Sequence, residues 1–386
     1  MKVLSFSYSE ELFMSAEQAL GDTLERSLGY SKHLEYYWMI IHALKKKHFQ
    51  SRQISDNFSI IPTNGSTRLH SLINMLNIAN TLCSSNHIDL IQSQEPLFAG
   101  FVALLLKKKY DIPVNICLYG GNIYDRHWLQ QKLLYRAFAG VGKYVLKKAD
   151  GIQVEGSLIK ESLIMHGIDA HKIFVKPMVP HNLNDFSVLH DKEIRTDLLK
   201  DTTYEHIILF VGRLIKEKNL TSLLRSIKLV VNVLPRTLLV VIGNGDQADA
   251  LLKASHQLSL DRNLKWIKHI AHAELPRYYN AADVFVLFST SEGFPRVLME
   301  AAAAGLPIVC SKISGSTDAI HDGETGFIVD INDISAFAEK IMLLLQNNAI
   351  RTRMANAAPQ YIKKIGTFDE NIIKQIRIWE NIIKEY

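Results

Sequence analysis

Two carboxylates lie eight positions apart in the stretch Ser291-Glu292-Gly293-Phe294-Pro295-Arg296-Val297-Leu298-Met299-Glu300. The apolar run before this stretch, Val284–Phe288, predicts a buried strand, and the alanine-rich segment after it predicts a helix. Pro295 suits the first helical position, and Gly305 suits the position just past the helix end. The stretch therefore predicts a strand, a tight loop and a helix.

This loop and helix start have the chemistry of a site for a phosphorylated sugar. Backbone N–H groups at a helix start carry partial positive charge and favour a phosphate. Glu292 is expected in the loop beside this phosphate-binding helix start, and Glu300 about two turns further along the helix. Because carboxylates accept hydrogen bonds from hydroxyls, the pair could hold a sugar and a ribose on either side of a diphosphate. Without the Gly-Phe-Pro turn, the same spacing would indicate one helix-starting acid and one solvated acid.

A second loop supplies positive charge. The run Ile207–Val211 predicts a strand that leads into Gly212 and Arg213, with Lys218 shortly after. A guanidinium fork suits phosphate oxygens, and a lysine adds a point charge. We expect both cations at the mouth of the sheet that carries Glu292, where they and the helix start at Phe294–Val297 could neutralise a leaving diphosphate. The chain has no Asp-x-Asp motif, so we predict no bound metal.

Three further segments follow predicted strands of the same half. Gly243-Asn244-Gly245-Asp246-Gln247-Ala248 formally matches a dinucleotide fingerprint but lacks its acidic partner, and we interpret it as a tight turn that lines the nucleotide site. The backbone of Lys268-His269-Ile270 could lie against a base, while the side chain of His269 is expected at the surface. Ser314–Thr317 could form a further polar rim.

The whole chain has the composition of a globular protein of two domains. It has 386 residues, 47% hydrophobic residues and a formal net charge of +5. Short lysine clusters in the first half fit solvated helix ends or a weak attraction to anionic lipid; they are Lys45–Lys47, Lys107–Lys109 and Lys147–Lys148. No basic stripe alternates with aromatic residues, so nucleic acid is not expected as a partner.

Cysteine usage and the N-terminus predict a cytoplasmic protein. The three cysteines, Cys83, Cys117 and Cys310, are far apart and form no CxxC motif, which is typical of buried thiols in a reducing compartment. The apolar stretch Leu97–Leu106 is too short to span a bilayer. Met1–Phe6 opens directly into a strand pattern without a signal-peptide layout. We therefore expect at most a peripheral contact with the inner face of the cell membrane.

Short apolar runs alternate with amphipathic helices along the chain, which predicts an α/β protein with parallel sheets. A break rich in proline and polar residues at Lys176–Asn182 predicts a domain boundary. The last helix, Asp369–Glu385, has an apolar face that needs a cover. The other predicted strands are Lys2–Phe6, Ile88–Gln92, Val114–Leu118, Gly151–Val154, Ile173–Val175, Thr237–Ile242, Leu264–Ile267 and Pro307–Cys310, and the predicted helices of the first half are Leu34–Lys46, Leu97–Lys108 and Leu129–Lys147.

Taken together, these motifs resemble the retaining glycosyltransferases of family 4, which have the GT-B fold. The resemblance is strong from Ile207 to Val329 and thinner before. It is carried by Gly212-Arg213-Leu214 with Lys218, Gly243-Asn244-Gly245, Leu275-Pro276-Arg277-Tyr278-Tyr279, Glu292-Gly293-Phe294-Pro295 with Glu300, Ala304-Gly305-Leu306-Pro307 and Asp322-Gly323-Glu324-Thr325-Gly326.

The resemblance implies two Rossmann-like domains whose parallel sheets face a central cleft. Residues 1–180 would bind the acceptor, residues 181–365 would bind a UDP- or GDP-linked sugar, and residues 366–386 would pack back on the first domain. Arg213 and Lys218 would hold the donor diphosphate, Glu300 the ribose and Glu292 the donor sugar. The residues implied in donor binding are Gly212, Arg213, Lys218, Gly243, Gly245, Lys268, His269, Ile270, Glu292, Gly293, Phe294, Pro295, Arg296, Val297 and Glu300, with Glu292, Arg213 and Lys218 implied in catalysis.

By the same resemblance, the reaction would be a front-face substitution with retention, without cofactor, toward a glycan or lipid-linked acceptor of a bacterial surface polysaccharide. The family commonly has a histidine after the strand that corresponds to Val114–Leu118, and this chain has Tyr119 there, followed by Gly120 and Gly121. The Tyr119 hydroxyl could still donate to a sugar oxygen.

Two other functions remain open from the sequence. The altered acceptor side, with Tyr119 in place of histidine, would also suit a catalytically weak subunit that binds a nucleotide sugar and supports a partner enzyme. The glycine pattern at Gly243 and Gly245 would suit a dinucleotide-dependent oxidoreductase, although the fingerprint lacks its structural context.

Overall fold

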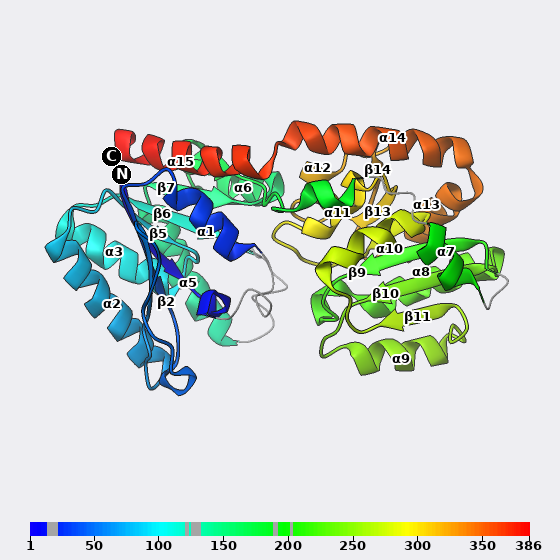
Figure 1. Ribbon diagram of the computed structural model, residues 1–386, viewed down its shortest axis with the longest axis horizontal. Coiled ribbons are helices and arrows are strands. Elements are labelled where there is room, and N and C mark those ends of the chain that lie inside the picture. Colours follow the sequence, from blue (N-terminus) through cyan, green and yellow to red (C-terminus); the bar gives the residue numbers. More distant parts are fainter. Residues whose placement is uncertain (14–21, 120–122, 125–132, 188–191, 201–203) are drawn as a thin grey trace. The chain divides into compact units, whose positions relative to one another are not determined.

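The computed structural model describes residues 1–13, 22–119, 123–124, 133–187, 192–200 and 204–386. The chain forms two compact units (Figure 1). Unit 1 comprises Met1–Lys176 together with Phe368–Tyr386, and unit 2 comprises Pro177–Thr367.

Unit 1 is built on a sheet in which eight strands are described, in the order β3-β4-β2-β1-β5-β6-β7-β8. All neighbouring strands pair in parallel except β3 and β4, which are antiparallel. The strands are β1 (Lys2–Ser7), β2 (Tyr36–Ile41), β3 (Arg52–Ser55), β4 (Phe58–Pro62), β5 (Leu90–Ser93), β6 (Val114–Leu118), β7 (Gly151–Val154) and β8 (Ile173–Val175).

Helices cover both faces of this sheet, because successive residues of each strand point to opposite sides. Leu4 and Phe6 of β1 pack with residues of α2 (Arg68–Ser85), α3 (Phe98–Tyr110), α5 (Leu133–Lys148) and α6 (Ser157–Met165). Val3 packs on the other face, with residues of α1 (Thr23–Ser31) and α15 (Phe368–Glu385). Short 3-10 helices are η1 (Glu10–Phe13), η2 (Lys45–Lys47) and η3 (Ala170–Lys172).

The prediction of a helix over Leu34–Lys46 is wrong. Its central part, Tyr36–Ile41, is the strand β2, which lies between β1 and β4 and is buried along nearly its whole length. A parallel strand that is covered on both faces has a continuous apolar sequence, which periodicity alone does not distinguish from a buried helix. The aromatic and β-branched residues of this run favour the strand.

Most other elements of unit 1 lie close to their predicted places. The strands Val114–Leu118, Gly151–Val154 and Ile173–Val175 are observed with those bounds, and the strand expected at Ile88–Gln92 begins two residues later, at Leu90. The helix expected over Leu129–Lys147 is observed from Leu133, since residues 129–132 lie outside the described part.

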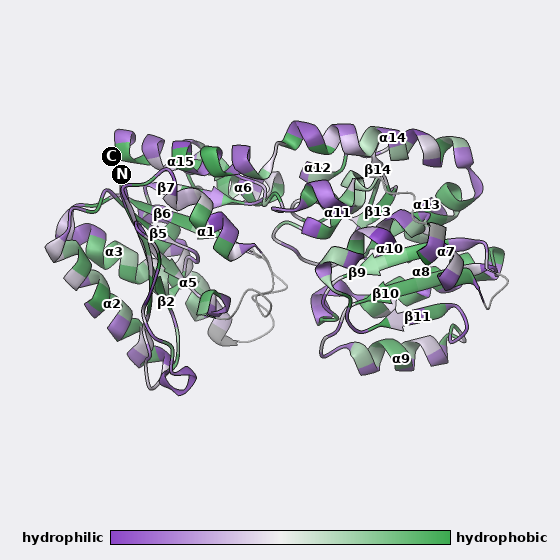
Figure 2. Cartoon of the chain, in the orientation of Figure 1, coloured by the Kyte–Doolittle hydropathy of each residue, from purple (hydrophilic) through white to green (hydrophobic). Residues whose placement is uncertain are grey.

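Unit 2 has a sheet of parallel strands in the order β11-β10-β9-β12-β13-β14. The strands are β9 (His206–Val211), β10 (Thr237–Ile242), β11 (Leu264–Ile267), β12 (Val284–Leu287), β13 (Ile308–Ser311) and β14 (Gly326–Val329). The predicted strands of this half agree with these within one residue at each end. Figure 2 shows β9 and β10 as hydrophobic strands, in keeping with their almost complete burial.

The helices of unit 2 follow its strands in alternation. They are α7 (Lys192–Leu199), α8 (Leu220–Val233), α9 (Ala248–Gln257), α10 (Leu275–Ala281), α11 (Arg296–Ala303), α12 (Ser316–Ala319), α13 (Ile334–Gln346) and α14 (Asn348–Ile365), with the 3-10 helices η4 (Leu183–Phe186), η5 (Lys216–Lys218) and η6 (His272–Glu274). Because all strands are parallel, the loops that follow them leave the same edge of the sheet, where ligands of α/β proteins bind.

The three cysteines are buried free thiols. No helix in the described residues is both long and apolar enough to span a bilayer.

The C-terminal helix α15 completes the core of unit 1. Ile372, Ile376 and Ile382 pack in the same cluster as Val3 of β1, and Trp379 is fully buried there. The Trp379 indole N–H donates to Gln92 Oε1 at 2.7 Å. The last residues of the chain therefore belong structurally to its first domain.

We expect Trp379→Ala to destabilise unit 1 by about 3–5 kcal/mol, because it leaves a large cavity and removes one of the two donors to the buried Gln92 amide oxygen. Urea denaturation followed by circular dichroism measures the change in the free energy of unfolding. The matched control is Glu380→Ala on the exposed side of the same helix, for which we expect a change within about 0.5 kcal/mol. Equal stability of the two variants would contradict this account of α15.

Candidate functional site

The donor-side residues predicted from the sequence all lie at one edge of the unit 2 sheet. Gly212 and Lys218 follow β9, Gly243 follows β10, Lys268 follows β11, and Glu292 follows β12 and precedes α11. The chain runs from β9 to β10 and β11 on one side and then returns to β12 on the other side. The edge between β9 and β12 is therefore the point where the strand order reverses, the usual ligand site of such sheets.

Backbone contacts hold the loops after β9 and β10 together. Leu214 N–H donates to Asn244 O at 2.9 Å, and Gln247 N–H donates to Leu214 O at 2.9 Å. A Cβ atom at Gly243 would lie 1.9 Å from Gly212 O, and one at Gly245 would lie 2.2 Å from Leu214 O. Both glycines are thus needed for this approach, which fixes the loop that carries Arg213.

Lys218 and Glu292 form an ion pair at this edge. The Lys218 ammonium donates to Glu292 Oε1, which also accepts from the Ser289 hydroxyl at 2.8 Å. The side chains of Lys218 and Glu292 are only 10% and 17% exposed. Within the described part of the chain, Glu292 Oε2 accepts no hydrogen bond. The pair therefore leaves one carboxylate oxygen and further ammonium protons for a ligand.

The main chain supports this ion pair on both sides. Thr290 N–H donates to Glu217 O at 2.8 Å, which ties the loop after β12 to the loop after β9. Asn219 has a left-handed φ of 51°, so the chain turns sharply from η5 into α8 directly after Lys218. Two loops that are far apart in the sequence are thereby held at a fixed separation.

Arg213 differs from Lys218 in its surroundings. Its side chain is exposed, and it forms no hydrogen bond or ion pair with any residue that the structure describes. An exposed guanidinium on the same loop as Lys218 is available for an anion, and its planar fork suits two oxygens of one phosphate.

Glu300 is buried and held by a tyrosine that the sequence analysis quoted without a role. It is 5% exposed, and Tyr279 OH donates to its Oε2 at 2.8 Å. Burial and the neighbouring Glu300 carboxylate hold the pKa of Tyr279 well above its ordinary value, so the phenol stays a donor. Tyr279 is fixed by stacking on Phe285, with ring centroids 5.4 Å apart. Glu300 is therefore a positioned acceptor.

The start of α11 corrects two details of the prediction. The helix begins at Arg296, so Pro295 is the capping residue and not the first helical residue. Glu300 is the fifth residue of α11 and lies just over one turn from its start, not two. Pro295 caps without a side-chain acceptor for the first N–H groups. Arg296 and Val297 of the first turn are half-buried.

The end of α11 agrees with the prediction for Gly305. Gly305 has a φ of 65°, its N–H donates to Ala302 O, and Leu306 N–H donates to Ala301 O. This pair of hydrogen bonds is the Schellman arrangement, which favours glycine just past a helix.

The turn before α11 is packed against the loop that follows β13. Gly293, Phe294 and Pro295 are buried. Gly315 has a φ of 75°, and a Cβ atom there would lie 2.7 Å from the Phe294 ring. The side chain of any other residue would therefore displace the turn that carries Glu292.

Two hydroxyl groups near Gly315, one in that loop and one in α12, are buried without a partner among the described residues. Ser314 Oγ and Thr317 Oγ1 form no hydrogen bond within the described residues. Buried hydroxyls normally have a partner, so an unpartnered pair at a sheet edge suits a ligand that supplies acceptors. This placement is compatible with the expected polar rim at Ser314–Thr317.

The segment after β11 is anchored by a tryptophan. Trp266 Nε1–H donates to Gly243 O at 2.8 Å, and the Lys268 ammonium lies 5.4 Å from the Trp266 ring centroid. Lys268 and His269 are exposed, whereas Ile270 is half-buried. The backbone of these residues therefore lies next to the glycine turn after β10.

The residues predicted for the acceptor side belong to unit 1. Tyr119 directly follows β6, and its hydroxyl accepts from the buried Gln153 amide at 3.5 Å. Burial, Cys117 and Tyr30 hold the pKa of Tyr119 well above its ordinary value. Gly120 and Gly121 lie outside the described residues.

The sequence did not reveal the supporting contacts of Ser289 and Tyr279. Each hydrogen-bonds to one predicted acid, and only the folded chain brings them together. For Tyr279 a signal existed, because its motif Leu275-Pro276-Arg277-Tyr278-Tyr279 was already part of the resemblance. Across the part of the chain that is described, no group of three or more His, Cys, Asp or Glu side chains could hold a metal ion.

Solved structures place this architecture in the GT-B class. A sucrose-phosphate synthase from Thermosynechococcus elongatus superposes with a TM-score of 0.82 at 17% identity, over 100% of both chains. The Anabaena protein HepE in complex with UDP superposes with a TM-score of 0.73 at 16% identity, over 98% of both chains. These likenesses confirm the predicted fold class, an α/β protein with the GT-B fold.

Sequence comparison supports the resemblance for the second half of the chain. Residues 191–361, which are less than half of the chain, match the family described as glycosyl transferases group 1. A capsular polysaccharide biosynthesis glycosyltransferase of Staphylococcus aureus is 30% identical over 181 residues, which are 47% of this chain and 45% of that protein. An uncharacterized glycosyltransferase of Methanocaldococcus jannaschii is 25% identical over 298 residues, 76% of each chain. The chain thus spans less than half the length of the Staphylococcus aureus relative.

We expect Tyr279→Phe to lower nucleotide affinity about ten- to a hundredfold, because the variant removes the hydrogen bond that orients Glu300 and keeps the packing of the ring. The loss of such a bond to a charged group corresponds to about 1.5–3 kcal/mol. Titration calorimetry with UDP and GDP measures the effect. The matched control is Tyr278→Phe, the neighbouring tyrosine on α10. Unchanged affinity in Tyr279→Phe would show that Glu300 needs no support from Tyr279.

Proposed function

We propose that the chain is a retaining glycosyltransferase that moves a hexose-type sugar from a nucleoside diphosphate donor to a hydroxyl acceptor. The observation that carries this proposal is the grouping of Lys218, Glu292 and Arg213 at the switch point of the unit 2 sheet, with Glu300 positioned on α11. This grouping supplies both the cations that a diphosphate needs and the carboxylates that sugar hydroxyls need.

The two cations would act on the leaving group. When the bond between the anomeric carbon and the diphosphate breaks, negative charge grows on the diphosphate, and groups aimed at that charge stabilise the transition state. The exposed Arg213 would bind phosphate oxygens in a fork, while Lys218 would add one ammonium proton and keep its bond to Glu292. The amides at the start of α11 would add to this stabilisation without a metal ion.

The two carboxylates would position the donor. Glu292 Oε2 accepts no hydrogen bond from any residue that the structure describes, and it would accept one from a hydroxyl of the sugar. Glu300 would accept from the ribose hydroxyls while Tyr279 holds its other oxygen. A donor held at both ends in this way reaches a reactive geometry without further ordering.

The acceptor hydroxyl would attack from the side that the diphosphate leaves. A departing diphosphate oxygen would take the proton of the attacking hydroxyl, so that the new bond has the configuration of the old one. No side chain would serve as nucleophile in this scheme. The donor would be UDP- or GDP-linked, and the Anabaena relative crystallised with UDP supports the first choice.

The acceptor would be a glycan or a lipid-linked glycan of the bacterial surface. Relatives of this chain include a lipopolysaccharide core biosynthesis glycosyltransferase of Rhizobium meliloti, 28% identical over 43% of this chain. An acceptor on a lipid would require the enzyme to work at the inner face of the membrane, as a peripheral protein.

The outer layer of unit 1 supports such a contact. The helices α2, α3 and α5, which pack side by side, contain no Asp or Glu. On α3, Phe101 and Leu105 are 41% and 42% exposed and lie one turn apart. Positive charge attracts anionic headgroups at about 1 kcal/mol per residue near the surface. The basic residues of these helices are Arg68, Lys107, Lys108, Lys109, Arg136, Lys143, Lys147 and Lys148, of which Lys107 is already paired with Asp150.

We expect the wild-type chain to sediment with vesicles that contain phosphatidylglycerol, and less so with phosphatidylcholine alone or in high salt. The double variant F101E/L105E should abolish sedimentation, because it places charge where the acyl chains would be. The control L229E/V233E changes two exposed apolar residues of α8 in unit 2 and should bind like wild type. Equal binding by both double variants would exclude the α3 surface.

We expect Arg213→Ala to lower the turnover of a nucleotide sugar by about a hundred- to a thousand-fold, the usual cost of one transition-state contact. Release of UDP or GDP from a panel of nucleotide sugars, each with a mixed-acceptor pool, measures the rate. The matched control Arg225→Ala removes an exposed arginine of α8 and should retain full activity. Wild-type turnover in Arg213→Ala would refute the proposed function.

Tyr119, which stands where the family commonly has a histidine, favours a second candidate function. In that function the chain would be a catalytically weak subunit that binds a nucleotide sugar and supports a partner enzyme. Tyr119 hydrogen-bonds to Gln153 within unit 1, and so one of its bonding capacities is already used. Tight donor binding by the wild-type chain, without release of nucleotide for any acceptor, would favour this second function.

A further inference from the structure

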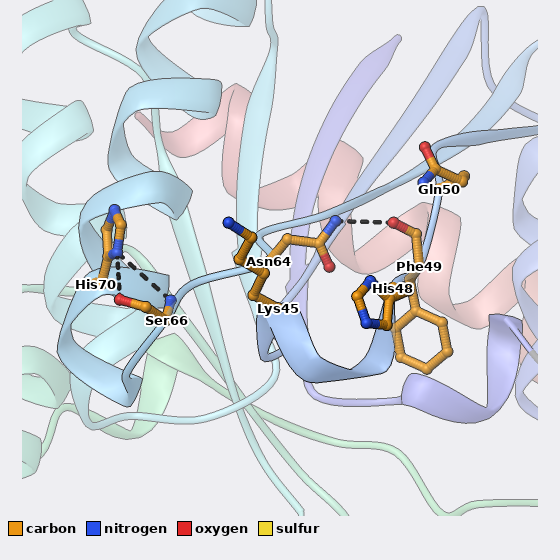
Figure 3. Close-up of a pocket in the computed structure, with 7 residues that line it drawn as sticks. All are labelled: Lys45, His48, Phe49, Gln50, Asn64, Ser66 and His70. Atoms are coloured by element: carbon orange, nitrogen blue, oxygen red, sulfur yellow. Dashed lines mark hydrogen bonds between the residues drawn. The ribbon is translucent and has the colours of Figure 1, made fainter.

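A pocket of about 360 Å³ lies in unit 1, whereas the residues that the proposed mechanism uses belong to unit 2 (Figure 3). Its lining comes from two segments that follow neighbouring strands, namely the loop after β2 and the loop and helix after β4. Both strands are parallel, so the pocket lies at the carboxyl edge of the sheet. Its lining residues are Lys45, His48, Phe49, Gln50, Asn64, Ser66 and His70.

The two segments are held together by main-chain bonds. Lys45 N–H donates to Gly65 O at 2.9 Å, and Gly65 N–H donates to Ala43 O at 3.1 Å. A Cβ atom at Gly65 would lie 2.2 Å from Ser71 N, so only glycine allows this approach. Across the pocket, the Asn64 amide donates to Phe49 O at 2.8 Å. The pocket is therefore a formed part of the fold.

Its lining has positive but no negative ionisable groups. The exposed Lys45 ammonium forms no hydrogen bond or ion pair with a described residue. Ser66 donates to His70 Nδ1 from its main-chain N–H at 3.4 Å, and its hydroxyl lies 2.8 Å from the same nitrogen (Figure 3). Because Nδ1 accepts, the proton of the neutral ring is on Nε2, which remains a donor. These groups suit an anion.

One acceptor atom in the pocket has no partner. Asn64 Oδ1 is buried and receives no hydrogen bond within the described residues. Asn64 also has a left-handed φ of 45°, a conformation that costs free energy and is held by the bond from its amide to Phe49 O. A buried carbonyl oxygen normally has a donor. An anion alone cannot supply one, but a hydroxyl group on the same ligand can.

We propose that this pocket binds an anionic group, a phosphate or a carboxylate, carried by a hydroxylated ligand such as a charged sugar. Lys45 and the His70 Nε2 proton bind the anion, and Asn64 Oδ1 accepts from a hydroxyl. The identification of this ligand as part of the acceptor rests on the proposed glycosyl transfer, because unit 1 is the expected acceptor domain. Binding to the pocket itself does not depend on that function.

Calorimetric titration of the full chain with glucose 6-phosphate, glucuronate, inorganic phosphate and glucose tests the proposal. We expect saturable binding of at least one of the two charged sugars and none of glucose. Lys45→Gln should weaken this binding about tenfold, the effect of one charge-assisted hydrogen bond. The control Lys46→Gln removes the neighbouring exposed lysine, which does not line the pocket, and should change the affinity less than twofold.

The outcomes separate this inference from the proposed function. Preference for glucose 6-phosphate or for glucuronate identifies the anion as phosphate or carboxylate. No saturable binding of either charged sugar, or equal weakening by Lys45→Gln and Lys46→Gln, overturns the inference. Titration of the same samples with UDP and GDP reports on unit 2 separately, so that a failure of nucleotide binding counts against the glycosyltransferase proposal and not against the pocket.

Discussion

The ion pair between Lys218 and Glu292 is the contact on which the candidate site depends. Both side chains are largely buried, and a buried charge without a partner costs considerable free energy. The fold must therefore bring the two groups together. It does so because β9 and β12 are neighbours in the sheet although they are far apart along the chain. The hydrogen bond from Thr290 to Glu217 keeps that spacing in the loops. A pair held in this way keeps the ammonium oriented before any ligand arrives.

Much of unit 2 could be predicted from the sequence, because its strands are short, strongly apolar and separated by clear turn residues. Thr237–Ile242 and Leu264–Ile267 are observed with the predicted bounds. In unit 1 the same reasoning failed at Tyr36–Ile41, where burial on both faces removed the alternation that marks a strand. The local sequence pattern does not show which other elements cover a segment. At Tyr36–Ile41 the cover on both faces of the sheet decided between a strand and a helix.

The candidate site shows a similar division. Arg213, Lys218 and Glu292 could be named from their motifs, because the chemistry of a diphosphate demands such residue types after strands. Ser289 and Tyr279 could not be assigned, because their importance comes from a hydrogen bond to one particular acid. The pocket around Lys45 could not be predicted either, since its two walls are the segments that follow β2 and β4, a strand pair that the sequence had not revealed.

The membership of α15 in unit 1 has a consequence for biosynthesis. A chain leaves the ribosome from its N-terminus, and domains generally fold as they emerge. Residues 1–176 and 177–367 are synthesised before residues 368–386, so the sheet of unit 1 still lacks Trp379 and the isoleucines of α15 after all of its strands have been made. Unit 1 is therefore begun before unit 2 and completed after it, and the apolar face that α15 covers must be kept from aggregation until that helix has been made.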